Sequence, residues 1–414
     1  MKKIGLLSFL LIFPLFLQAQ LKAVYLAPPK HIGGLRATGK DYPYVIPFVA
    51  TDETFFVQFD DLEGDEKNYY YRIRRFDENW HPSDLLPQEY IDGYDSDMIQ
   101  NQENSRATTV SYTHYSFKIP NENTRIKLSG NYLIEILDED ENPVFNIPLI
   151  VYEHTVNVAV QARRTNDPAT LTTHHFIEFS IFPNGLQPLN PATDLRVILL
   201  RNENLFDARV FGNPTFVLPN ELRYREPARA TLLAGNEFLS FESRDLRGYN
   251  RGVAASELKE FYEFYLPVYF PRRNYLELHD IDGSFLFDSF QGRDNKDLES
   301  DYVRVHFRLN KSALPDNGKA YVVGRWNNWQ TTERYRLKPV EGENFAETVI
   351  PLKQGYYDYY YVGRKPDGSI DWTAVTPSFY ETENRYTVLV YYRPPGARYT
   401  RVVGLGQAVS KPLK

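Results

Sequence analysis

The sequence predicts an all-β protein built from tandem β-sandwich domains of the immunoglobulin-like or fibronectin-like kind. Short runs rich in Tyr, Phe, Val and Ile recur along the chain, and these residues favour a pleated, half-buried surface. Gly, Asn, Asp and Pro separate the runs, as they do in turns between strands. No convincing amphipathic helix interrupts them.

The N-terminus has the features of a secretory signal peptide over residues 1–19. Lys2 and Lys3 precede an apolar stretch, and Leu17-Gln18-Ala19 offers a small-residue cleavage context. The stretch is shorter than the roughly 20 residues that a membrane-spanning helix needs, although a retained N-terminal anchor is an alternative. We therefore expect an exported protein whose mature part is soluble.

Composition narrows the class of protein further. The chain has no cysteine, so an exported form must stabilise its domains by buried cores and without disulfides. The formal net charge of −7 argues against a nucleic-acid-binding protein, which needs a basic face. We expect no cofactor and a monomer.

The first expected domain spans residues 20–154, after the signal peptide. Its Tyr- and Phe-rich runs predict strands at residues 54–60, 69–76, 111–120, 130–137 and 144–153.

The second expected domain spans residues 155–298. Strands are expected at residues 176–182, 195–201, 238–242 and 261–270, where Pro267 predicts an edge position or a bulge. Asp280-Ile281-Asp282-Gly283-Ser284 predicts a hairpin turn between strands at 275–278 and 285–287.

The third expected domain spans residues 299–414 and follows a charged linker at residues 292–301. Apolar and polar side chains alternate over residues 303–309, which is typical of a strand with one buried face. Further strands are expected at residues 320–324, 345–351, 355–362 and 386–393.

The sequence does not favour an enzyme or a metal site. His174 and His175 point to opposite faces of a strand and cannot bind one metal ion together. Asp280 and Asp282 open like a calcium loop, but the further acidic ligands are missing. No Gly-x-Ser-x-Gly elbow or Walker loop occurs, so we expect no catalytic residues.

Trp326 and Trp329 are the candidate contact residues for a ligand or partner. They lie in Gly324-Arg325-Trp326-Asn327-Asn328-Trp329, which with residues 355–359 is similar to starch- and glycogen-binding early-set modules. An exposed tryptophan face can stack on a sugar ring, which makes a carbohydrate-binding protein the alternative function. The structural interpretation is that Trp329 caps the core of the third domain.

Many short segments together resemble one family over nearly the whole mature chain. They include Trp80-His81-Pro82-Ser83, Tyr112-Thr113-His114-Tyr115 and, further along, Gly235-Asn236-Glu237-Phe238 and Tyr391-Tyr392-Arg393. Through these sequence segments the chain resembles the plug protein family of the type IX secretion system. One departure is Arg75-Phe76, where the family usually has a His-Cys pair, and we interpret it as a change in packing.

The resemblance implies a non-enzymatic periplasmic protein that seals the outer-membrane translocon channel of the type IX secretion system in its resting state. Its partner would be the large outer-membrane β-barrel of that channel. The protein itself would not be inserted in the membrane.

Overall fold

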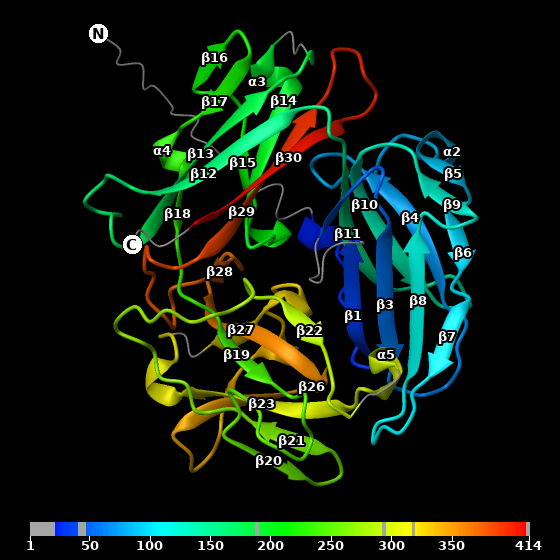
Figure 1. The fold of residues 1–414 in the computed structure, drawn as a ribbon, viewed down its shortest axis with the longest axis vertical. Helices are drawn as coiled ribbons and strands as arrows, with labels where there is room; N and C mark the ends of the chain where they lie inside the picture. Colours follow the sequence, from blue (N-terminus) through cyan, green and yellow to red (C-terminus); the bar gives the residue numbers. More distant parts are fainter. Residues whose placement is uncertain (1–20, 40–46, 187–189, 292–294, 317–318, 411–414) are drawn as a thin grey trace, which may run out of the picture.

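The computed structural model describes residues 21–39, 47–186, 190–291, 295–316 and 319–410, and the predicted signal peptide at 1–19 lies outside these residues. The described chain forms three β-sandwiches (Figure 1). The helices α2 to α5 have four residues each, so the all-β prediction is confirmed. Among the described residues, no helix is long and apolar enough to span a membrane.

The first sandwich packs a four-stranded sheet on a five-stranded one. The first sheet contains, in spatial order, β1 (Ile32–Gly39), β3 (Phe55–Asp61), β8 (Thr113–Ile119) and β7 (Asn101–Asn104). The second contains β2 (Phe48–Ala50), β11 (Pro143–Tyr152), β10 (Gly130–Leu137), β4 (Tyr70–Phe76) and β6 (Ser96–Met98). The helix α2 (Pro87–Tyr90) and the ribbon of β5 (Ile91–Gly93) and β9 (Thr124–Ile126) complete it. Strands β3, β4, β8, β10 and β11 lie close to the five runs predicted as strands.

The second sandwich combines strands from the middle of the chain with two from its C-terminal end. One sheet contains β12 (Asn157–Arg164), β13 (His174–Phe182), β17 (Glu221–Tyr224), β16 (Phe216–Leu218) and β18 (Thr231–Leu233). The other contains β15 (Arg209–Phe211), β14 (Leu195–Arg201), β29 (Asn384–Tyr392) and β30 (Arg401–Ser410). Short helices α3 (Pro191–Asp194), α4 (Pro227–Ala230) and η1 (Leu205–Asp207) connect these strands.

The third sandwich is built from the part of the chain that lies between β18 and β29 of the second sandwich. One sheet contains β20 (Ala255–Leu258), β21 (Tyr262–Tyr265), β23 (Tyr302–Asn310), β26 (Phe345–Lys353) and β25 (Lys338–Pro339). The facing strands are β19 (Leu239–Glu242), β27 (Gly355–Arg364), β22 (Phe285–Phe287), β24 (Ala320–Val323) and β28 (Ile370–Asp371). The connecting helices are α5 (Lys296–Glu299), η2 (Lys311–Ala313), η3 (Arg325–Asn327) and η4 (Glu333–Tyr335).

This pairing differs from the contiguous domains expected at residues 155–298 and 299–414. β29 pairs with β14 over seven residues, so the C-terminal hairpin completes the second sandwich. β21 pairs in parallel with β23, which joins the two sides of the expected linker into one sheet. Within that expected linker, Ser300 and Asp301 are buried against the first sandwich.

Two local expectations were wrong. Residues 275–278 form no strand, so the turn at Asp280-Ile281-Asp282-Gly283 does not join a hairpin. The strand expected at 261–270 ends at Tyr265, two residues before Pro267, because proline cannot donate a ladder hydrogen bond.

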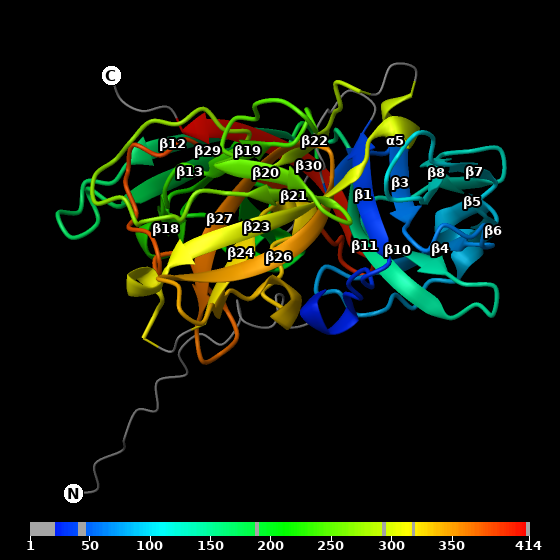
Figure 2. The same cartoon turned by 90° about the horizontal axis from the view of Figure 1, so that it is seen from below.

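A shared apolar layer joins the first sandwich to the second. The outer face of the β10–β11 sheet presents Leu133 and Ile150 to Leu200 and Leu389 on the outer face of the β14–β29 sheet. Leu21, from a helical turn that follows the predicted cleavage site, is buried in the same layer. The two sandwiches therefore share a core and do not merely touch, and Figure 2 shows the first one set beside the other two.

Candidate functional site

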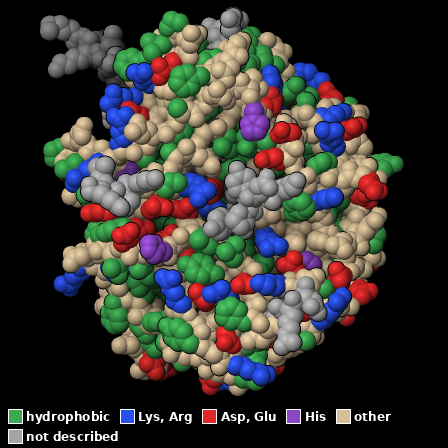
Figure 3. All heavy atoms as spheres, in the orientation of Figure 1, with side chains coloured by type: hydrophobic (Ala, Val, Ile, Leu, Met, Phe, Trp, Pro, Cys, Tyr) green, Lys and Arg blue, Asp and Glu red, His purple; other side chains and the backbone are tan. Residues whose placement is uncertain are grey.

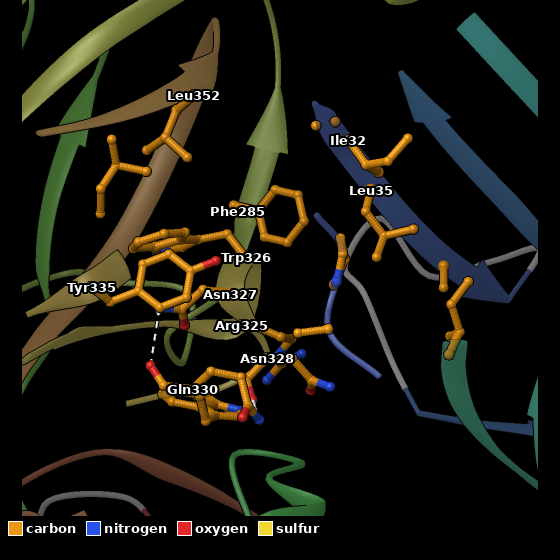
Figure 4. Close-up of a pocket in the computed structure, with 18 of the residues that line it drawn as sticks. Ile32, Leu35, Phe285, Arg325, Trp326, Asn327, Asn328, Gln330, Tyr335 and Leu352 are labelled. Carbon is orange, nitrogen blue, oxygen red and sulfur yellow. Dashed lines mark hydrogen bonds between the residues drawn. The ribbon is translucent and has the colours of Figure 1, made fainter. Parts of the chain in front are cut away.

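One cavity lies where the three sandwiches meet. Its volume is about 130 Å³. The first sandwich contributes Ile32 and Leu35 of β1, the second contributes Glu203 and Leu205, and the third contributes most of the remaining wall. Figure 4 shows Ile32 and Leu35 across the cavity from Phe285 and Trp326.

The loop that carries the two candidate tryptophans folds in a way its sequence explains. Gly324 donates its N–H to Asn327 Oδ1, and Asn327 Nδ2 donates to the carbonyl of Val322, so this amide closes the loop. Asn328 and Trp329 then adopt left-handed backbone conformations with φ of 52° and 59°. Two successive residues of this kind turn the chain sharply, which sends the two indoles in different directions.

Trp326 lines the cavity as a half-buried side chain. Its ring stacks on Phe307 at 5.8 Å between centroids and meets Tyr335 edge-on at 5.8 Å. Its indole N–H donates to the carbonyl of Asp358 at 3.0 Å. One face of the indole is therefore already engaged in the core.

Trp329 is only 3% exposed. It packs against Phe238 and Trp372, with ring centroids 5.8 and 5.7 Å away. This agrees with the structural interpretation of Trp329 as a core side chain, and the two tryptophans do not form one platform.

Buried ion pairs border the cavity where the sandwiches meet. Arg325 of the third sandwich pairs with Glu203 of the second, and both are at most 8% exposed. Lys353 of β26 bonds Asp60 of β3 at 2.7 Å, and that carboxylate also accepts from the Tyr302 hydroxyl at 2.6 Å. These pairs bridge different sandwiches, because β3 lies in the first one and β26 in the third.

Backbone close to the Asp60 pair must be glycine. Gly34 has φ of +57°, and a Cβ there would lie 2.3 Å from Asp60 Oδ2. Neither Asp60, Lys353 nor Glu203 was singled out from the sequence. The available signal was a charged residue at the end of an apolar strand, which is common on surfaces and does not reveal burial.

The described lining of the cavity contains no Ser, Thr, His or Asp, and its carboxylate, Glu203, is paired with Arg325. The lysine of the lining, Lys353, is likewise paired, with Asp60.

The histidines and acidic residues elsewhere serve structural roles. His175 is buried and bonds the Tyr386 hydroxyl at 2.8 Å, whereas His174 lies on the other face of β13. Burial lowers the pKa of His175 to about 4, so the ring is neutral at pH 7.

Among the described residues, His31, Asp61 and Glu63 bring ligand atoms within 4.8 Å of one another. Lys67 already bonds both of these carboxylates.

The turn that resembled a calcium loop encloses a carboxylate from β27. Asp358 Oδ2 accepts the backbone N–H groups of Ile281 and Gly283 at 2.6 and 3.2 Å. Asp280 accepts from Phe238 and Asp282. Burial, followed by the nearby charge of the other carboxyl, raises the pKa of Asp358. The turn thus organises a buried acidic pair.

The Arg75-Phe76 departure lies at a packing position. Arg75 is 4% exposed and donates to the carbonyls of Ser129 at 3.0 Å and Thr400 at 2.7 Å. Phe76 belongs to the apolar layer between the first two sandwiches.

Comparisons with known proteins place the first sandwich in a family. Residues 34–153 match the family described as the type 9 secretion system plug protein 1st domain. These residues hold all of the first sandwich except the start of β1. A search of curated proteins gave no match.

The fold of nearly the whole chain is shared with a solved structure. The chain is similar to the crystal structure of a hypothetical protein from Parabacteroides merdae, with 27% sequence identity and a TM-score of 0.88. The similarity covers 93% of this chain and 99% of that chain. The first sandwich is therefore similar to the first domain of type 9 secretion system plug proteins, over residues 34–153.

Proposed function

We propose that the protein is a non-enzymatic periplasmic plug that binds the outer-membrane translocon channel of the type 9 secretion system and closes it at rest. The match of residues 34–153 to the plug protein 1st domain carries this proposal. An export signal expected at residues 1–19 is consistent with a periplasmic location.

The rigidity of the molecule supports the same function. A plug must keep its shape under load, and separate domains on linkers would not. Here the first and second sandwiches share an apolar layer, and the buried pairs Asp60–Lys353 and Glu203–Arg325 join the third to both. A buried pair that loses one partner is costly, so these contacts resist separation.

The surface suits a contact that can be released. In the view of Figure 3, acidic and basic side chains are interspersed. Large aromatic side chains are exposed on the surface, such as Tyr94 at 67% and Tyr249 at 87% exposure. Tyr is a frequent anchor in protein interfaces, and reversible interfaces keep a polar rim.

Copurification with the channel tests the proposal. We expect a tagged form of the full chain, extracted in mild detergent, to retain a very large outer-membrane β-barrel protein. Tyr94→Ser and Tyr249→Ser are the first variants to compare, because each removes one exposed aromatic anchor on a different sandwich without touching a core. Failure to recover any outer-membrane barrel, in cells with an assembled translocon, would contradict the proposal.

Deletion of the gene gives an independent measurement. An unsealed channel should admit large solutes, so we expect increased sensitivity to vancomycin while secretion of type 9 substrates continues. The deletion in a strain without the channel is the matched control and should show no added sensitivity. Unchanged permeability with the channel present and no substitute plug would exclude a sealing role.

A second candidate function is carbohydrate binding at the cavity. Trp326 and Tyr335 line it beside the polar side chains of Asn328 and Gln330, and aromatic rings with a polar rim suit sugars. Affinity electrophoresis against glucans tests it: binding that Trp326→Ala abolishes would favour this function. Because the indole already stacks on Phe307, the plug function is the better supported of the two.

A further inference from the structure

A second, much smaller cavity lies between the second and third sandwiches. Its volume of about 10 Å³ has room for a single water-sized particle. The walls come from the turn after β14, from the segment that leads into β19, and from Trp372 after β28. The cavity is thus lined by elements that are distant in sequence.

Three groups in its walls that can only donate hydrogen bonds have no protein partner: Asn204 Nδ2, Asn236 Nδ2 and Trp372 Nε1, each of them buried. The Tyr360 hydroxyl, which also lines the cavity, is buried without a partner as well, and it can donate or accept. Asn204 and Asn236 are 2% and 3% exposed as whole residues. A buried donor without a partner costs about 1–3 kcal/mol, so three around one cavity require an explanation.

The orientation of both amides is fixed. Asn204 Oδ1 accepts the N–H of Phe206 at 2.9 Å, and Asn236 Oδ1 accepts the N–H of Glu237 at 2.9 Å. Exchanging O and N in either side chain would place two donors against each other. The NH₂ groups are therefore the ends left without a partner, and an indole N–H can only donate.

Four carbonyls in the same walls are already engaged. The carbonyl of Asn202 accepts from Arg325, that of Ala234 from the Asn384 amide, and that of Gly235 from the N–H of Phe379. The carbonyl of Asn204 accepts the N–H of Asp207. A water molecule could donate one hydrogen to the Tyr360 hydroxyl, but its oxygen has two lone pairs and would leave one of the three donors without a partner.

The local charge also suits an acceptor. The Arg201 guanidinium lines the cavity and lies 4.8 Å from the centre of the Trp372 ring. Its ion-pair partner Asp207 is 3.9 Å away and does not line the cavity. Each wall group without a partner offers a hydrogen, and the nearest full charge in the wall is positive.

We propose that this cavity is a binding site for one monatomic anion, chloride in ordinary buffers, which the Asn204, Asn236 and Trp372 donors hold between the second and third sandwiches. Space for one water-sized particle favours a monatomic anion over carboxylates, phosphate and sulfate. The anion satisfies three buried donors at once and joins two sandwiches, so occupancy stabilises their packing. This inference is independent of the plug function.

Crystals of the full chain grown in sodium bromide test the position. We expect an anomalous bromide peak within hydrogen-bond distance of Asn204 Nδ2, Asn236 Nδ2 and Trp372 Nε1. A peak there in the wild type and none in Trp372→Phe would support the site. Density for a water molecule without any anomalous signal would overturn the proposal.

Thermal unfolding tests whether the bound anion stabilises the folded protein. Chloride is exchanged for gluconate, which is too large to enter the cavity, so that the ionic strength stays constant. Binding to the folded state alone should raise the unfolding midpoint by about 1–2 °C for each tenfold rise in chloride above the Kd. Asn236→Asp keeps the acceptor of the Glu237 N–H and puts a carboxylate in place of the amide, so its midpoint should not depend on chloride.

Trp326→Phe is the matched control, because it removes an indole N–H that donates to Asp358 outside this cavity. Its midpoint should fall but keep the chloride dependence of the wild type. A bromide peak with a midpoint that is flat in chloride would mean an adventitious ion only. Equal chloride dependence in the wild type and Asn236→Asp would also overturn the site.

Discussion

At the scale of single residues, the strongest constraints are buried charges. Asp60 is fully buried, which disfavours its charged form, but Lys353 and His114 outweigh this effect and hold its pKa below the usual value. Lys353 is 2% exposed and also donates to the carbonyl of Asp297. The carboxylate thus depends on a cation from another sandwich.

Lys353→Met should be strongly destabilising. It keeps much of the side-chain volume but leaves the Asp60 carboxylate without its cation, and breaking a buried pair in this way costs about 3–5 kcal/mol. Urea unfolding measures the loss. Lys259→Met, which breaks an exposed pair with Glu257, should change the stability by less than about 1 kcal/mol. Similar effects in the two variants would contradict the role of the buried pair.

Glu237 makes stability depend on pH. Burial raises its pKa to about 8, and the charge of Asp280 acts in the same direction. The folded state therefore holds a proton that the unfolded chain has released at the same pH, so this contribution is full below the ordinary Glu pKa of about 4.3 and is lost as pH rises towards 8.

Glu237→Gln should remove the loss of stability that the wild type shows as pH rises towards 8. Its amide oxygen can still accept from the Tyr275 hydroxyl and the Glu383 N–H, as the carboxylate does now. We expect the variant to be about 1–3 kcal/mol more stable than the wild type at pH 8.5 and nearly equal at pH 5. Denaturant titrations at the two pH values measure this, and a difference that does not vary with pH would show that Glu237 is not protonated in the folded state.

At the scale of elements, the sequence predicted strands well and their partners poorly. The Leu- and Ile-rich runs at 130–137 and 195–201 became β10 and β14 with the same bounds. The alternation of apolar and polar residues shows which face of a strand is buried, but it does not indicate which sheet the strand joins. The run at 386–393 was therefore recognised as a strand and assigned to the wrong sandwich.

The same limit applies to the candidate cavity. The Trp326 loop could be recognised because its Gly, Asn and Trp residues lie close together in sequence. The groups across from it, Ile32 and Glu203, come from other sandwiches. Only the folded chain brings these segments together, so the cavity could not be predicted.

The C-terminal hairpin should be essential to the second sandwich. β29 buries Tyr386, Val388 and Val390 in its core, and Leu389 and Tyr391 in the layer shared with the first sandwich. A chain that ends at residue 383 loses both surfaces. We expect it to be insoluble or to lack the near-ultraviolet circular dichroism of the full chain. A soluble, cooperatively folded product would mean that the second sandwich closes without β29.

At the scale of the whole molecule, the order of the chain interlocks the three sandwiches. The third is inserted between β18 and β29 of the second, so the chain leaves the second sandwich and returns to it. The first is fixed to the second by the apolar layer and to the third by Asp60 and Lys353. Each sandwich therefore depends on contacts with both of the others.

This interlocking should make unfolding a single cooperative event. Scanning calorimetry of the mature chain at pH 6 should show one transition whose calorimetric and van't Hoff enthalpies agree, because no sandwich can unfold without exposing a core or a buried charge of its neighbours. Lys353→Met is the informative comparison: by weakening the contact between the first and third sandwiches, it should lower the midpoint and broaden the transition. Two or three resolved transitions in the wild type would show independent domains. Such a molecule could bend at its joints, which a channel seal cannot do without leaking, so this result would also weaken the case for a plug.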